Sequence, residues 1–175
     1  MKPKTIEFSQ VQIQYSPEED RIMMRLNTKG DEQFIMAFTR KFVQTFWPAL
    51  VQVLSYDPNF VNYDTATQQA ALAFQHQEVL DNANYEQPFK MDNMQYPWGQ
   101  TPLLANKAVI KKPEESLPIL GIYSANNIGF EFPSNHNVLH YLYKGLSDLV
   151  NRIGWDINLQ NLLDNAPKPD KRHLN

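Results

Sequence analysis

The sequence predicts an α+β fold in which a unit of three strands and one helix occurs twice. Three observations indicate this fold. Apolar residues alternate with a period of two in six short segments, two longer segments have helical spacing, and the order strand, strand, strand, helix is the same in both halves. Short turns join successive strands, so we expect antiparallel meanders packed against amphipathic helices. An extra helix and an irregular aromatic loop separate the two units.

The length and composition indicate one globular domain over residues 1–175. Hydrophobic residues make up 42% of the chain and charged residues 20%, which excludes a chain that is disordered throughout. The absence of cysteine excludes disulfides, thiol nucleophiles and cysteine-ligated metals. The net charge of −3 disfavours non-specific nucleic-acid binding. No apolar run reaches the ~18 residues of a membrane span and no signal peptide begins the chain, so we expect a cytoplasmic protein without membrane contact.

The first unit covers residues 4–56. Thr5–Tyr15 alternates with a change of phase near Ser9–Gln10, which predicts a strand with a β-bulge. Arg21–Thr28 and Gln33–Phe38 alternate without interruption and predict the second and third strands.

A helix follows the third strand, with Thr39 as its N-cap. Seven of its residues form an apolar stripe, which we expect to pack on the apolar face of the third strand. The stripe consists of Phe42, Val43, Phe46, Trp47, Leu50, Val53 and Leu54. Pro48 lies within it, so this proline either kinks one helix or begins a second. The unbroken phase of the stripe favours the kink.

Residues 57–101 are an insert between the units. Asp64–Asn82 predicts a helix with a weaker apolar stripe, and from Ala83 to Pro102 the periodicity is lost. Long irregular segments in compact domains are uncommon and are often functional. Four rings lie in this one: Tyr85, Phe89, Tyr96 and Trp98. Two interpretations stay open, because the rings either cover a sheet edge or core margin, or form an exposed patch for a partner.

The second unit covers residues 102–155. Leu103–Lys112, Leu117–Ser124 and the alternation of Ile128, Phe130 and Phe132 predict three strands, and a helix capped by Ser134 or Asn135 ends at Gly154. When the two helices are aligned at an offset of 96 residues, all seven stripe positions of the first helix align with apolar residues of the second. At an offset of 94 residues, the apolar alternation of the two third strands also aligns. We interpret this as an internal repeat. Residues 156–175 predict a docking segment followed by a polar tail.

The sequence contains no pattern that indicates catalysis or a bound cofactor. His136 and His140 are four residues apart, but a metal site needs a third ligand and the His-Glu-x-x-His pattern is absent. We interpret both as surface histidines. No phosphate-binding glycine loop and no nucleophile elbow occurs. We therefore expect no catalytic residue, no cofactor and no metal.

The residues Glu19-Asp20-Arg21, Arg25 and Asn27-Thr28, followed by Thr39-Arg40-Lys41-Phe42-Val43 and Trp47-Pro48-Ala49-Leu50, form a recognisable pattern. It resembles that of an uncharacterised family of bacterial proteins, EDR…R.NT…TR+FV…WPAL. The resemblance covers mostly the first fifty residues and, more loosely, the last strand–helix unit ending in Gly154-Trp155. It implies a bacterial origin and carries over no activity and no catalytic residue.

The repeated meander and helix also resemble, in topology alone, the single-strand nucleic-acid binders of the Whirly and Pur type. Those folds bind through sheet faces that carry basic and aromatic residues. The corresponding face here is polar but barely basic and has no ring: Gln10, Gln12, Gln14, Met23, Arg25 and Ile35. Nucleic acid is therefore an unlikely partner.

The leading hypothesis is a non-enzymatic binding or adaptor module that binds another protein or itself, as a homodimer. Its candidate partner-binding residues are Tyr85, Phe89, Tyr96, Trp98, Arg25 and Arg40. One alternative is a single-stranded nucleic-acid binding protein. The other is a small-ligand binder or enzyme with a pocket between the sheet and the helices.

Overall fold

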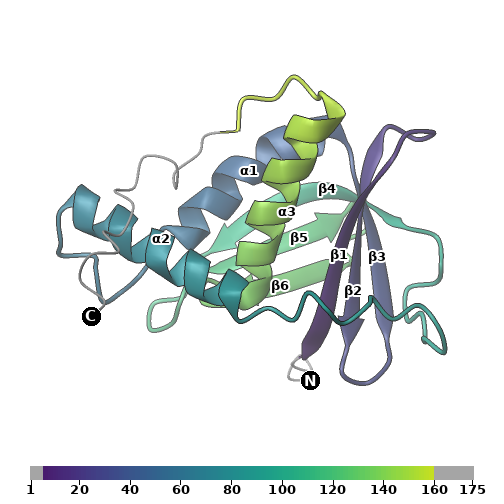
Figure 1. The fold of residues 1–175 in the computed structure, drawn as a ribbon, viewed down its shortest axis with the longest axis horizontal. Coiled ribbons are helices and arrows are strands. Elements are labelled where there is room, and N and C mark those ends of the chain that lie inside the picture. Colours follow the sequence, from purple (N-terminus) through teal and green to yellow (C-terminus); the bar gives the residue numbers. More distant parts are fainter. Residues whose placement is uncertain (1–5, 160–175) are drawn as a thin grey trace.

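The computed structural model describes residues 6–159 and confirms the α+β class (Figure 1). Its elements follow in the predicted order, with three strands and a helix in each unit and one extra helix between them. They are β1 (Phe8–Ser16), β2 (Arg21–Thr28), β3 (Gln33–Phe38), α1 (Arg40–Leu54), α2 (Thr65–Asp81), β4 (Leu103–Lys111), β5 (Ile119–Ser124), β6 (Gly129–Pro133) and α3 (Asn137–Ile153). The predicted docking segment is described as far as Leu159, and its remainder and the predicted tail lie outside the described residues.

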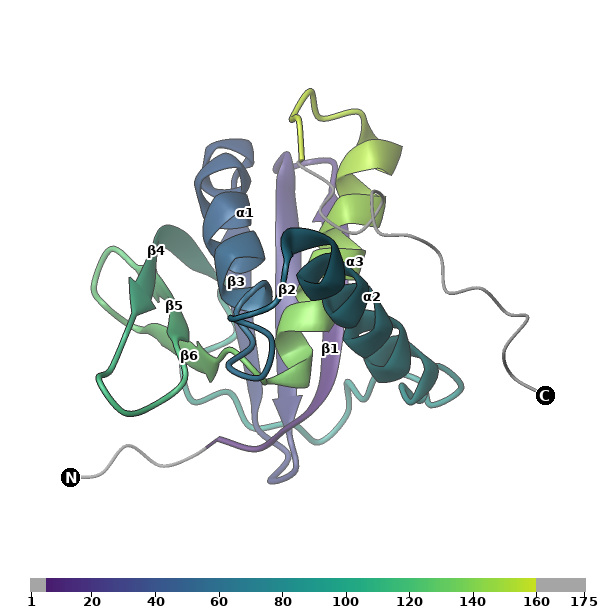
Figure 2. The same ribbon diagram turned by 90° about the vertical axis from the view of Figure 1, so that its left-hand side faces the viewer.

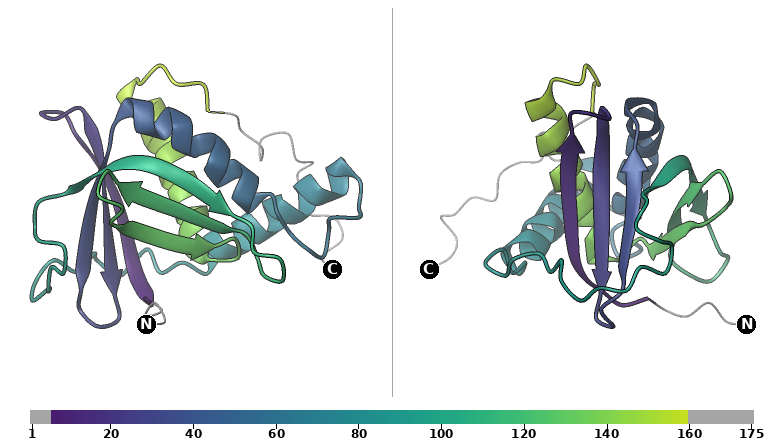
Figure 3. Two further views of the ribbon diagram at one scale, coloured as in Figure 1. Left: turned by 180° about the vertical axis from the view of Figure 1, so that it is seen from behind. Right: turned by 90° about the vertical axis from the view of Figure 1, so that its right-hand side faces the viewer.

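The six strands form one mixed sheet in the order β1-β2-β3-β4-β5-β6. Within each meander the neighbours are antiparallel, and only β3 and β4 are parallel. That junction is short, since it consists of Met36 opposite Leu103 and Ala37 opposite Leu104. The strands of the second meander cross the direction of the first, so the sheet is strongly twisted (Figures 1 and 3).

The predicted bulge in β1 is confirmed. The register of β1 on β2 shifts between Phe8 and Gln10, which reconciles the two phases of apolar alternation. β4 has the same irregularity between Ala105 and Lys107, at the same place in the second unit.

One offset of 96 residues relates the second strand, the third strand and the helix of the two units. Met24 lies opposite Met36 in the first ladder, and Leu120 lies opposite Phe132 in the second, 96 residues further on. The predicted offset of 94 for the third strand is therefore wrong. It counted Ile128 as a strand residue, but Ile128 precedes β6 and is 41% exposed.

The long helices are exchanged between the units. α1 packs chiefly on β4 and β5 of the second meander, although its stripe also reaches Phe38, whose ring centroid lies 5.0 Å from that of Phe42. α3 packs on β1 of the first meander. We expected the α1 stripe to pack on its own third strand, and this was only partly right, because the twist of the sheet brings the second meander alongside α1 (Figure 2).

α1 is one continuous helix. Thr39 is its N-cap, and the hydroxyl oxygen of Thr39 accepts the Phe42 amide at 3.1 Å. Pro48 lies inside the helix, so the alternative of a second helix beginning there is wrong.

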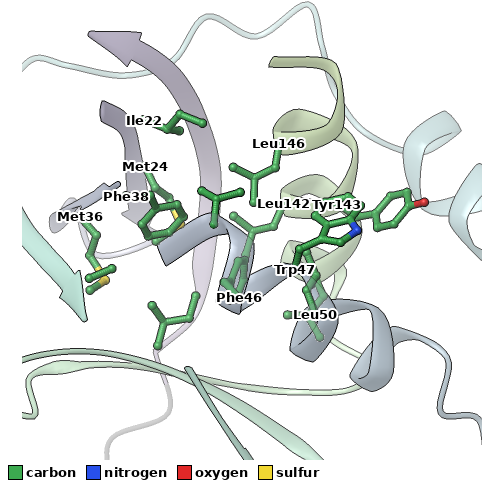
Figure 4. Close-up of a cluster of buried hydrophobic side chains, with 14 of the residues drawn as sticks. Ile22, Met24, Met36, Phe38, Phe46, Trp47, Leu50, Leu142, Tyr143 and Leu146 are labelled. Carbon is green, nitrogen blue, oxygen red and sulfur yellow. The ribbon is translucent and has the colours of Figure 1, made fainter. Parts of the chain in front are cut away.

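The core lies between the twisted sheet and the pair α1 and α3 (Figure 4). All seven residues of the α1 stripe and their seven counterparts on α3 are buried. Trp47 and Tyr143, which are counterparts at the offset of 96, stack on each other with ring centroids 4.8 Å apart. Equivalent residues meet each other where a two-fold axis passes between two copies of a unit, and this stack has that arrangement.

Rings from the two edge strands close the core at its lower end. Phe8 of β1 lies 5.5 Å from Phe130 and 5.4 Å from Phe132 of β6, measured between ring centroids.

Among residues 6–159, none of the helices has both the length and the apolar character needed to cross a membrane.

Candidate binding groove beside strand β1

A groove of about 820 Å³ runs along the outer side of β1. Strand β1 is its floor, the first half of α3 is one wall, and the end of α2 with the segment after it is the other wall. Its lining consists of Phe8, Ser9, Gln10, Val11, Ile13, Leu80, Ala83, Asn84, Tyr85, Gln87, Phe89, Asn135, His136, Asn137, Val138, Tyr141, Lys144 and Gly145.

The floor of the groove is an edge strand. Within the described part of the chain, β1 pairs with β2 alone, so its other side presents backbone N–H and C=O groups without a strand partner. α3 lies directly on β1 at Gly145, where a Cβ would be 2.6 Å from Ile13 Cδ1. The missing side chain lets the helix approach the strand closely.

The lining is aromatic and rich in amides. Four rings (Phe8, Tyr85, Phe89 and Tyr141) alternate with the amide side chains of Gln10, Asn84, Gln87, Asn135 and Asn137. Lys144 is its one permanently charged residue, and no carboxylate lines it. The first turn of α3 contains no acidic residue either. Because Lys144 is paired with Asp148 one turn further along α3, the positive potential of this wall comes chiefly from the N-terminal end of the helix.

The two side chains of the lining that could serve as a base or as a nucleophile, His136 and Ser9, already have structural roles. His136 is the N-cap of α3, where its Nδ1 accepts the Val138 amide at 3.2 Å, so the prediction of Ser134 or Asn135 as the cap is wrong. Burial lowers the pKa of His136, so this ring is neutral at neutral pH and can accept. The Ser9 hydroxyl donates to the Asn27 carbonyl at 3.2 Å. Neither residue forms part of a nucleophile–base pair.

A buried amide network fixes the segment that follows α2. Gln10 Oε1 accepts the backbone amide of Lys90 at 2.9 Å, and Asn27 Nδ2 donates to the Lys90 carbonyl at 2.8 Å. Gln33 Nε2 in turn donates to Asn27 Oδ1 at 2.8 Å. The segment crosses the lower ends of the first meander (Figure 1), and these contacts hold its groove-lining part in place.

The second wall is held by a pair of histidines. His76 of α2 and His140 of α3 face each other with 3.1 Å between their Nδ1 atoms. Both are buried, with 9% and 6% of their surfaces exposed. The prediction that His140 is a surface residue is therefore wrong, and His136 is half-buried. The His76–His140 contact had no signal in the sequence, because the two residues are 64 positions apart.

The four rings predicted as partner-binding residues separate into two groups. Tyr85, which is 73% exposed, and Phe89 line the groove. Trp98 instead packs against Phe34 and Phe130, with ring centroids 4.7 and 4.6 Å apart. Tyr96 is half-buried and does not line the groove. Trp98 therefore covers the core margin, as one interpretation predicts, and a partner patch that includes Tyr85 stays a prediction.

The two predicted arginines lie away from the groove. Arg25 donates to Gln14 Oε1 at 3.3 Å on the opposite face of the sheet. Arg40 lies 3.9 Å from Asp20 and 5.6 Å from the centroid of the Trp155 ring, and Trp155 also donates to Asp20. The six predicted residues therefore do not form one surface.

A second surface that the sequence reasoning missed lies on the outer face of the second meander. The Tyr123 ring lies over Gly121, and the Nζ atoms of Lys107 and Lys111 are 5.7 and 5.8 Å from its centroid. Glu131 accepts hydrogen bonds from Tyr123 and Lys111. The alternation in β4 and β5 could have placed these side chains on one face.

Among residues 6–159 no group of three or more histidine, aspartate or glutamate side chains could hold a metal ion. Comparison of the chain with family models, curated proteins and solved structures finds no match.

Proposed function

We propose that this protein is a non-enzymatic binding module that receives an extended segment of another protein along β1. The observation that carries the proposal is the juxtaposition of an edge strand with an open groove of about 820 Å³. A segment that pairs with a free edge gains main-chain hydrogen bonds, and its alternate side chains enter the neighbouring groove. The wall of rings and amides suits such side chains.

The lining also indicates the chemistry of the partner. Tyr85 and Tyr141 offer apolar faces with polar tips, and Phe89 offers an apolar ring, which are typical of interface residues. The N-terminal end of α3, whose first turn has no acidic residue, favours a carboxylate over a cation, whereas Lys144 is already paired with Asp148. We therefore propose a segment with alternating apolar residues and an aspartate or glutamate near the N-terminal end of α3.

A peptide selection tests the proposal. A phage-displayed library of linear peptides is selected against the full chain at pH 7.5, and hydrogen exchange maps where the selected peptides bind. We expect protection of β1 amides and at least a tenfold loss of affinity in Tyr85→Ala and in Tyr141→Ala. Tyr63→Ala is the matched control, because Tyr63 is 56% exposed and lies outside the groove. Selected peptides that protect another surface, or no selected peptide at all, would contradict the proposal.

Two further proposals concern the predicted repeat and the predicted homodimer. We propose that the two units arose by duplication, which the common offset of 96 and the Trp47–Tyr143 stack support. Self-association and bacterial origin stay predictions. Light scattering after size exclusion tests self-association, and a monomer mass at high micromolar concentration would contradict it.

Single-stranded nucleic acid is the second candidate partner. The outer face with Lys107, Lys111 and Tyr123 supports it, since exposed sheet faces with bases stacked on rings are one mode of single-strand binding. Glu131, placed among these groups, and the net charge of −3 oppose it. A fluorescent oligonucleotide titrated at low salt decides, and unchanged anisotropy would remove this candidate.

A further inference from the structure

α2 is attached to the rest of the molecule through a narrow contact. It packs on α3, and His76 is the one buried residue among its seventeen. Leu72 is half-buried against the core, whereas Phe74 is 65% exposed. A helix with so little apolar burial has little hydrophobic stabilisation. The contact around His76 is therefore the buried part of the docking of α2, beside the hydrogen bond from Gln75 to Asp57 Oδ2 at 2.6 Å.

The contact at His76 has a defined protonation requirement. With 3.1 Å between the two Nδ1 atoms, one ring donates a hydrogen bond and the other accepts it, so the accepting nitrogen carries no proton. A first added proton places a positive charge in a contact that is almost free of water. A second removes the acceptor and turns two N–H groups toward each other.

We propose that the His76–His140 pair is a proton-operated latch, which holds α2 on α3 while both rings are neutral and releases α2 when the pair takes up protons. The proposal concerns the regulation of the groove and in that respect rests on the function proposed above. The latch itself is a property of the chain without any partner.

The surroundings of the pair disfavour charge on either ring. Burial and the neighbouring His76 lower the pKa of His140 to about 4, and burial and the charge of Lys144 lower the pKa of His76. From α3, Tyr143 presents its ring to His76 at 5.4 Å between centroids and carries no charge. Trp47 of α1 stacks on Tyr143 and carries no charge either. Lys144 is itself paired with Asp148, and within residues 6–159 no carboxylate is hydrogen-bonded to either ring.

The direction of the effect follows from linkage. A released His140 takes up its proton near the ordinary pKa of 6.5, whereas the docked ring does so only at about 4. Docking is therefore unaffected above pH 6.5 and weakens as the pH falls from 6.5 towards 4. One linked histidine changes the docking equilibrium about tenfold per pH unit, so we expect roughly a hundredfold loss by pH 4.5.

Release of α2 would displace the part of the second groove wall nearest the helix, because the amide network holds the remainder of the segment at Lys90. Leu80, Ala83, Asn84 and Tyr85 belong to the end of α2 and the residues that follow it, and all four line the groove. The floor on β1 and the wall on α3 do not depend on the latch. Acid therefore weakens the binding of a segment in the groove and releases it.

Pulsed electron paramagnetic resonance between two spin labels tests the latch in the full chain. The natural chain has no cysteine, so labels at Phe74→Cys on α2 and Asn151→Cys on α3 are unique, and both positions are exposed. We expect one narrow distance distribution at pH 7.5 and, at pH 4.5, a second population at longer distances. The change should reverse when the pH is raised.

The controls separate the latch from other histidines and from unfolding. In His76→Gln with His140→Gln, the amides keep a donor and an acceptor but do not titrate, so the longer-distance population at pH 4.5 should disappear. His140→Gln alone serves as the test if the double variant is not folded at pH 7.5. His136→Asn keeps a capping side chain on α3 and should leave the acid response unchanged.

Three results would overturn the latch. They are an unchanged distance between pH 7.5 and 4.5, an acid response that persists in the glutamine variant, and a response that appears only together with loss of near-ultraviolet circular dichroism. The peptide selection is carried out at pH 7.5 and the distance measurement without peptide, so a failed groove and a failed latch are distinguishable.

Discussion

Trp47 and Tyr143 occupy equivalent positions in the two units and stack on each other. Gln44 and His140 are also equivalent, but their surroundings differ. Gln44 is exposed beside the segment at Ile157–Leu159, and His140 is buried under α2. The helix surfaces that face the core are therefore alike in both units, and the surfaces that face outward differ. The insert after the first unit produces this difference.

The outer faces of the two meanders differ for the same reason. In the first unit, the segment around Lys90 covers Asn27 and Gln33 and leaves both almost fully buried. In the second unit nothing among the described residues covers Tyr123 in this way, and its ring lies over Gly121 between two lysines. Function in this protein is therefore to be sought where the units differ.

The largest expected effect tests whether equivalent core positions contribute equally to the free energy of unfolding. Phe46 and Leu142 are both fully buried. Phe46→Ala should lower the free energy of unfolding by about 3–5 kcal/mol, and Leu142→Ala by about 2–5 kcal/mol, because each leaves a cavity. Urea denaturation measures both values. A loss below about 1 kcal/mol at either position would break the equivalence.

The next effect separates His140 from its counterpart Gln44. In the unfolded chain His140 is protonated below its ordinary pKa of 6.5, but in the folded chain only below about 4. Its contribution to stability is therefore complete above pH 6.5 and is lost as the pH falls to 4, at most about 3 kcal/mol. Unfolding measured from pH 7.5 to 4.5 should show a smaller decrease in His140→Gln. Equal decreases in both proteins would contradict the prediction.

A smaller effect concerns the contact between equivalent rings. A double-mutant cycle with Trp47→Leu and Tyr143→Leu should give a coupling energy of about 0.5–1.5 kcal/mol, the usual value for an aromatic pair beyond its burial. The four proteins of the cycle are compared by chemical denaturation. Additive effects would show that the two rings lie side by side without stabilising each other.

The smallest effect concerns the outer face of the second unit. Lys111 and Glu131 form an ion pair, but their side chains are 48% and 43% exposed, so solvent screens the pair. Lys111→Met should change the free energy of unfolding by about 0.5 kcal/mol or less. A loss above about 1 kcal/mol would mean that this face contributes to the fold, as the face of the first meander does.

Periodicity and capping predicted most of the fold. The seven-residue stripe with Thr39 as its cap, the bulge at Ser9–Gln10 and the order of the elements were all correct. The site was predicted far less well. Tyr85 and Phe89 were named, but the groove is also formed by Phe8, Tyr141 and the free edge of β1. Whether β1 is an edge strand depends on which strands pair in the folded sheet.

By itself, the sequence determined the local elements and the identity of the core residues, because hydrophobic spacing and caps act within a few neighbouring positions. Only the tertiary structure decided that β3 joins β4, that α1 and α3 exchange meanders, and that His76 meets His140. Those arrangements depend on sheet twist and on contacts between residues more than sixty positions apart. Two amphipathic helices of equal pattern contain no information about which meander each will cover.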